Sequence, residues 1–130
     1  LMEIVTENAV TLAWLGDALM NTYIREHLLK KGYTRVDDLQ KKSTRYLSAK
    51  AQSRMLRQLE KEGFFLEDEA VILQRGKAAR IHTKAKNADV REYLQATALE
   101  ALLGYLHLYH HPDRLKMLLT RLAQIGDESL

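Results

Sequence analysis

Residues 8–24 read NAVTLAWLGDALMNTYI, and residues 93–109 read YLQATALEALLGYLHLY. Each stretch is almost wholly apolar and has one formal charge near its middle, Asp17 in the first and Glu100 in the second. Both patterns predict buried helices. A lone carboxylate on such a helix loses hydration, which is costly unless the group is paired, protonated or bound to a metal. Two helices that each offer one acid to a common place therefore predict a hard-cation site.

Composition limits the class of protein. At 130 residues the chain is expected to form one domain with an ordinary core. It has no cysteine, which excludes a disulfide framework and a thiolate zinc site and fits a reducing compartment. No signal-peptide pattern is present, and the apolar stretches contain acids, Asn, Thr and Gln, which argues against a membrane span. We therefore expect a cytoplasmic protein without a membrane partner.

The chain is predicted to be all-α. It has one proline and six glycines, its apolar residues recur at helical spacing, and no stretch alternates as a strand does. A loop is expected at 80–88, the least patterned part of the chain, and Asp89 is expected to cap the helix that follows. The expected helices cover about 7–31, 37–42, 43–62, 68–79, 89–109 and 112–126.

Basic residues are concentrated in two windows although the net charge is only +3. Residues 30–57 hold nine Lys or Arg, and residues 75–91 hold six. Two interpretations stay open. The windows are either solvated helix faces or a surface that binds phosphates, for which clustered Lys and Arg provide affinity without base specificity.

Other candidate motifs are weaker. His107 and His111 are four residues apart and could share a helix face as zinc ligands, but no third ligand is nearby, so a surface or packing role is expected. The chain has no glycine-rich phosphate loop and no nucleophile elbow. Tyr46 lies in a basic helix and is the aromatic residue that we rank first for contact with nucleic acid. Taken alone, Asp17 is also compatible with a structural role, bonded to a neighbouring Asn, Tyr or Lys.

Several short motifs, taken in order, resemble one enzyme family. Residues 15–18, LGDA, are similar to the core of the ribonuclease III signature, and residues 99–104, LEALLG, are similar to its second acidic helix. The short form of that family, Mini-ribonuclease III, is the closer resemblance, and it extends over about residues 9–126. Further support comes from KKS at 41–43, SAK at 48–50 with Gln52, and RGK at 75–77.

This resemblance implies an all-helical ribonuclease III endonuclease-domain-like bundle and a homodimer that cuts both strands of double-stranded RNA with Mg²⁺. Residues 1–130 would form a single catalytic domain without a double-stranded-RNA-binding domain. Asp17 matches the catalytic aspartate and Glu100 the metal-binding glutamate, so both are candidate catalytic residues and metal ligands. The implied substrate is the duplex stem of 23S precursor ribosomal RNA, and a large-subunit ribosomal protein is a candidate partner.

Some expectations concern surfaces. The two acidic helices are expected to cross near Gly16 and Gly104. The RNA-facing side is expected to include six basic residues, which are Lys50, Arg75, Lys77, Arg80, Lys84 and Lys86. Part of the dimer interface is expected among Trp14, Leu15, Met20, Leu102 and Tyr105.

The chain also departs from the full-length family pattern. Ala13 and Thr97 stand where full-length members have a second Glu and an Asp, so half of the usual carboxylates are missing. Ala78 stands where an Asn is frequent. These departures predict looser metal binding than a two-metal arrangement. They also leave two alternatives open, which are a non-catalytic helical RNA-binding or ribosome-associated module and a protein-interaction domain whose acids are structural.

Overall fold

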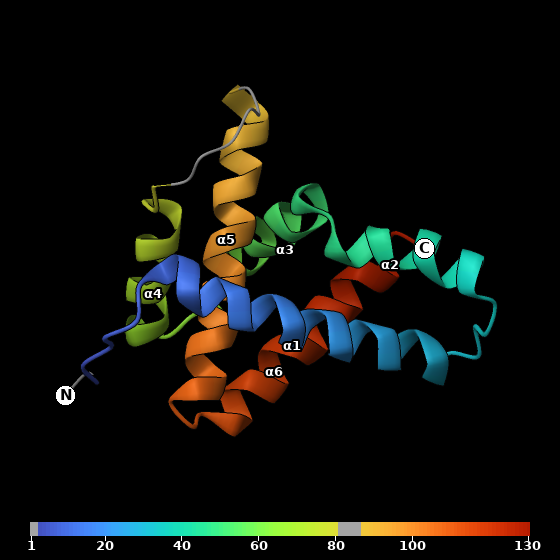
Figure 1. The fold of residues 1–130 in the computed structure, drawn as a ribbon, viewed down its shortest axis with the longest axis horizontal. Coiled ribbons are helices and arrows are strands. Elements are labelled where there is room, and N and C mark those ends of the chain that lie inside the picture. The colour runs from blue at the N-terminus through green and yellow to red at the C-terminus, as the bar shows by residue number, and fades with distance from the viewer. Residues whose placement is uncertain (1–2, 81–86) are drawn as a thin grey trace.

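The computed structural model describes residues 3–80 and 87–130, and in these ranges it consists of six helices without a strand (Figure 1). The predicted all-α class is confirmed. The helices are α1 (Ala9–Lys30), α2 (Val36–Leu47), α3 (Ala49–Lys61), α4 (Glu67–Lys77), α5 (Asn87–Leu108) and α6 (Pro112–Asp127). Within the described ranges, none of these helices has both the length and the apolar content needed to cross a bilayer.

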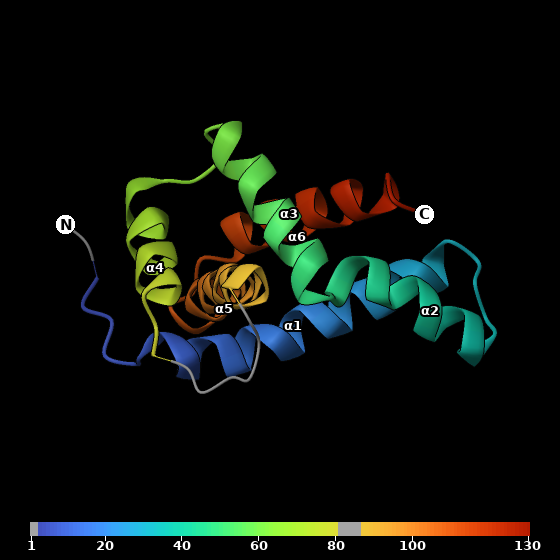
Figure 2. The same ribbon diagram turned by 90° about the horizontal axis from the view of Figure 1, so that it is seen from above.

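Helix α5 is the centre of the molecule. Figure 2 shows it nearly end-on, with α1, α3, α4 and α6 arranged around it, and each of these helices packs against it. Residues 96–106 are buried except for the half-buried Glu100. This segment has apolar residues on all sides and therefore no amphipathic pattern. Such a helix is stable only where neighbouring elements cover every face, as they do here. The prediction of a buried helix is therefore confirmed for residues 96–106, whereas Tyr93 at the start of the predicted stretch is exposed.

The same prediction is wrong for one face of α1. Leu12, Met20 and Ile24 face the core, but the opposite side of the helix is exposed in the single chain. Trp14 is 80% exposed, and Asp17 is exposed as well. The apolar stretch at 8–24 thus has two faces of similar composition, of which this chain covers only one.

Two glycines allow α1 and α5 to cross with their backbones in contact (Figure 1). A Cβ atom added to Gly16 would lie 1.7 Å from the backbone oxygen of Glu100, and one added to Gly104 would lie 2.0 Å from the backbone oxygen of Leu12. Neither position has space for a methyl group. The predicted crossing near Gly16 and Gly104 is therefore confirmed, and it requires glycine on both helices.

The predicted helix at 43–62 is interrupted. Ser48 has an extended backbone, with φ −64° and ψ 153°, and its side chain accepts a hydrogen bond from the Ala51 amide. It ends α2 and caps α3, because a serine hydroxyl competes with helical hydrogen bonds for nearby backbone amides. Helix α2 is accordingly longer than the segment predicted at 37–42.

The N-terminus of α5 also differs from the prediction. The helix begins at Asn87, so Asp89 lies in its first turn and is not the cap. An acidic residue in the first turn still interacts favourably with the positive end of the helix dipole. Residues 81–86, most of the loop predicted at 80–88, lie outside the described residues.

Replacing Gly16 with alanine should destabilise the protein by at least about 2 kcal/mol, because the added methyl group must push two helix backbones apart. Urea unfolding followed by circular dichroism measures the effect. The matched control is Thr22→Ala at an exposed position of the same helix, where the change should stay within about 0.5 kcal/mol. Equal stabilities of the two variants would contradict the close helix crossing.

Candidate active site

The crossing of α1 and α5 brings Asp17 and Glu100 together. Gly16 touches the backbone of Glu100, and Asp17 is the next residue along α1. The two carboxyl groups lie close enough for Asp17 to raise the pKa of Glu100. The predicted juxtaposition of the two acids is therefore present in the fold.

The two acids lie in different surroundings. Glu100 is half-buried on the central helix, and burial raises its pKa to about 8. The hydrogen bond with Asp17 and the negative charge of Asp17 add to this rise in pKa, whereas the amide of Gln52 opposes it. Asp17 is exposed, so the expectation that it is buried is wrong for the single chain.

Each carboxyl group also has one amide neighbour. Asn21 lies one turn after Asp17 on α1, and its Nδ2 donates to the Asp17 backbone oxygen at 2.8 Å and to Oδ1 at 3.1 Å. On α3, Gln52 points its Nε2 toward Glu100 Oε2 at 3.4 Å. The sequence left open a purely structural role for Asp17, bonded to a neighbouring Asn. In the structure Asp17 has that Asn neighbour and also lies beside Glu100.

The donor set suits one hydrated cation rather than a full protein cage. Within residues 3–80 and 87–130, no three His, Cys, Asp or Glu side chains cluster as metal ligands do. Two carboxylates are enough for Mg²⁺, which keeps several waters and takes few protein ligands. Ala13 and Thr97 are buried, and the Thr97 hydroxyl is already bonded to the Tyr93 backbone oxygen at 2.9 Å. They supply no further carboxylate, so the residues present fit a loosely held divalent ion.

Comparisons with known proteins show the family of the chain. The Ribonuclease III domain family matches residues 10–111, a range that contains both acids. A Mini-ribonuclease 3 of Streptococcus pneumoniae is 43% identical over 87% of this chain and 88% of its own length. A Mini-ribonuclease 3 of Staphylococcus aureus is 39% identical over 93% of this chain and 90% of its own. The chain belongs to the Mini-ribonuclease III family.

A solved structure supports the same assignment at the level of the fold. A protein from Fusobacterium nucleatum, known from its crystal structure, superposes with a TM-score of 0.74 at 30% sequence identity. The superposition covers 87% of this chain and 88% of the other. Membership of the Mini-ribonuclease III family makes the chain a ribonuclease, an endonuclease of the hydrolase class.

The basic residues proposed to face RNA differ in their surroundings. Lys50, Arg75 and Arg80 are exposed, and the two arginines line a hollow of about 630 Å³ beside the N-terminus of α1. Lys77 instead forms an ion pair with Glu60 at 2.6 Å, which partly neutralises it. Lys84 and Lys86 lie outside the described residues.

Two expectations about aromatic and apolar residues are corrected. Tyr46 is fully buried, and its hydroxyl donates to Asp127 Oδ1 at 2.6 Å, so it cannot stack on a nucleic-acid base. Met20, Leu102 and Tyr105 are buried within the single chain and belong to its core. Among the five residues expected at a dimer interface, only Trp14 and the half-buried Leu15 offer surface to a partner.

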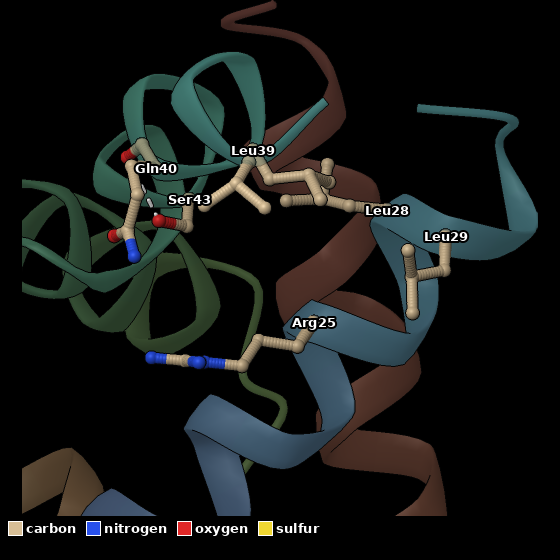
Figure 3. A pocket seen from close by; sticks show the side chains of 7 residues that line it. Arg25, Leu28, Leu29, Leu39, Gln40 and Ser43 are labelled. Atoms are coloured by element: carbon tan, nitrogen blue, oxygen red, sulfur yellow. Dashed lines mark hydrogen bonds between the residues drawn. The ribbon is translucent and has the colours of Figure 1, made fainter. Parts of the chain in front are cut away.

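A second hollow, between α1 and α2, is lined mainly by apolar side chains. It measures about 210 Å³, and Figure 3 shows Leu28, Leu29 and Leu39 along it, with Arg25 on its polar side. None of the residues that line it is an acid or a histidine. Neither Asp17 nor Glu100 lines it, so this hollow is separate from the candidate active site.

Gln52 was missed as a member of the site, although its position carried a signal. The apolar residues of its segment, such as Met55, Leu56 and Leu59, recur on one helix face. Gln52 lies on that same face at i−3, i−4 and i−7 from them, where a polar side chain is an exception. A polar residue on a core-facing stripe needs a polar partner, and here its amide donates to the Leu47 backbone oxygen and also approaches Glu100.

The raised pKa of Glu100 predicts a pH-dependent stability in the absence of metal. The folded-state pKa of about 8 exceeds the ordinary value of 4.5, so this group favours folding most below pH 4.5. That contribution is lost as the pH rises toward 8, by up to about 1.4 kcal/mol per pH unit. Urea unfolding in EDTA should show it as a difference between wild type and Glu100→Gln. The control Glu26→Gln, at an exposed acid of α1, should follow the wild type. Parallel pH profiles for wild type and Glu100→Gln would contradict the assignment.

Proposed function

We propose that the chain is a Mg²⁺-dependent endoribonuclease that hydrolyses phosphodiester bonds in double-stranded RNA, with Asp17 and Glu100 as its metal ligands. The observation that carries the proposal is the meeting of these two carboxyl groups at the glycine crossing of α1 and α5. A raised pKa caused by burial and a second acid is typical of functional carboxylates. Family membership adds the reaction class.

The side chains of the site have different roles. Glu100 lies half-buried on the central helix α5, and Asp17 is the exposed member of the pair. Bound Mg²⁺ would neutralise phosphate charge and lower the pKa of an attacking water. Asn21 holds the Asp17 carboxylate by a hydrogen bond from its Nδ2, which fixes the direction of its free oxygen. Because both acids must be ionised to bind the ion, metal binding removes the proton that Glu100 retains below pH 8.

A homodimer accounts for two features together. Duplex RNA has two antiparallel strands, whereas each chain has one pair of acids, and a two-fold axis would present one site to each strand. The outer face of α1 carries Trp14 and Val10 as exposed large apolar side chains, which in a monomer would contact water. This face lies on the same helix as Asp17. Burying it against a second chain would therefore link assembly directly to the site.

The substrate and setting follow from the same proposal. Duplex RNA is recognised mainly by shape and 2′-hydroxyl groups, and a catalytic domain acting alone should bind it weakly. A structured target such as the stem of 23S precursor ribosomal RNA, assisted by a large-subunit ribosomal protein, would compensate for weak binding. Such a role would place the enzyme in the cytoplasm.

Asp17→Asn should abolish RNA cleavage without loss of the fold, because it keeps the shape of the side chain but removes the charge that holds the ion. Cleavage of a duplex RNA is measured with and without Mg²⁺, and circular dichroism checks folding. Glu26→Gln is the matched control on the same helix and should cleave normally. Near-normal cleavage by Asp17→Asn would reject the assigned role. A folded wild type that binds duplex RNA but never cuts it would favour the non-catalytic module.

Arg75→Ala should weaken duplex RNA binding for all sequences and reduce the slope of log affinity against log salt by roughly one unit. Lys77→Ala is the natural comparison on the same helix, since Lys77 is already paired with Glu60 and should contribute less. Fluorescence anisotropy across a salt series, with the inactive Asp17→Asn background, gives both slopes. An unchanged slope for Arg75→Ala would move the RNA path away from the C-terminus of α4.

A further inference from the structure

One buried polar atom of the described residues has no hydrogen-bond partner among them, and it lies in the candidate active site. Gln52 is 2% exposed, and its Oε1 accepts no hydrogen bond from the described part of the chain. An unsatisfied buried acceptor costs roughly 1–3 kcal/mol. Native proteins contain few such atoms, so each one needs a physical explanation.

The orientation of this amide is determined by its neighbours. Gln52 Nε2 donates to the Leu47 backbone oxygen at 3.0 Å, at the C-terminal end of α2. Exchanging the amide nitrogen and oxygen would place two acceptors against each other, because a carbonyl oxygen cannot donate. The break between α2 and α3 at Ser48 therefore determines that Nε2 faces Leu47 and that Oε1 is the atom without a partner.

The same amide group reaches the acid pair. Nε2 also approaches Glu100 Oε2, at a distance of 3.4 Å that is long for a hydrogen bond. Gln52 Oε1 thus belongs to a group that lies directly beside Glu100. Its missing donor must be small, must carry a proton, and must fit beside the amide group that approaches Glu100.

We propose that Gln52 is a positioning residue of the metal site, whose Oε1 accepts a hydrogen bond from a water in the hydration shell of the divalent cation. This inference rests on the proposed function, because it takes Asp17 and Glu100 as the ligands. Mg²⁺ keeps most of its waters, and each of them is a strong donor. Partners outside the first coordination sphere commonly change metal affinity by 10–100-fold.

The proposal also explains how two carboxylates could suffice to hold the ion, although Ala13 and Thr97 stand where full-length family members have two further acids. A neutral acceptor that binds a metal-held water adds affinity without a further negative charge beside Glu100. Gln52 would therefore help to bind the ion by accepting a hydrogen bond from a metal-bound water. The site would keep only the two negative charges of Asp17 and Glu100.

The test measures binding of Mn²⁺ alone, by electron paramagnetic resonance without RNA, to folded protein at pH 8.5. Gln52→Met has a similar shape but no acceptor, and its Mn²⁺ affinity should fall at least about tenfold. Gln52→Glu restores an oxygen acceptor although it also lacks the donor to Leu47, and it should bind Mn²⁺ at least as tightly as the wild type. Gln52→Leu gives the same comparison if Gln52→Met does not fold.

Two controls separate this role from packing and from the proposed function itself. Ser53→Ala removes the neighbouring buried hydroxyl, which bonds to Gln95 and not to Glu100, and should leave Mn²⁺ affinity unchanged. Asp17→Asn should lose Mn²⁺ binding. Wild-type affinity in Gln52→Met, or an equal loss in Gln52→Glu, would overturn the role of Gln52 alone. Wild-type Mn²⁺ affinity in Asp17→Asn would overturn both the metal site and the role of Gln52.

Discussion

The structure depends on the backbone contact between α1 and α5. Gly16 and Gly104 let the two helices approach until no methyl group fits between them, and the rest of the core packs around this crossing. Close approach is usually favoured by dispersion and by the exclusion of water. Here it has a second effect, because the residue after Gly16 is an acid and the residue whose backbone Gly16 touches is the other acid. The same contact that closes the core creates the site.

This arrangement places an unfavourable group on the central, buried helix of the fold. The pKa of Glu100 rises because the central helix removes its carboxyl group from water and brings it beside Asp17. Without metal, the neutral form relieves the repulsion, so the folded chain can keep the acid at modest cost. A divalent cation would replace that proton. The stability of the metal-free protein and the function of the site are thus coupled through one ionisable group.

The polar network around the acids shows how neighbouring elements adjust the site. Ser48 separates α2 from α3, and the end of α2 exposes a backbone oxygen that orients Gln52 toward Glu100. Lys77 forms an ion pair with Glu60, whereas Arg75, two residues before it, is exposed. Small differences in what packs nearby therefore decide which basic and polar groups are available to a ligand.

The sequence by itself determined the all-helical class, most of the helix positions, the family, and Asp17 and Glu100 as the isolated acids of two apolar segments. These features depend on local periodicity, on caps, and on short motifs whose residues are close in the chain. Tertiary structure decided which faces of the helices are buried and which are exposed. Tyr46 proved to be buried, Trp14 proved to be exposed, and Gln52 entered the site, because burial depends on which distant elements cover a helix. No local pattern distinguishes the covered face of α1 from its exposed one, since both are apolar.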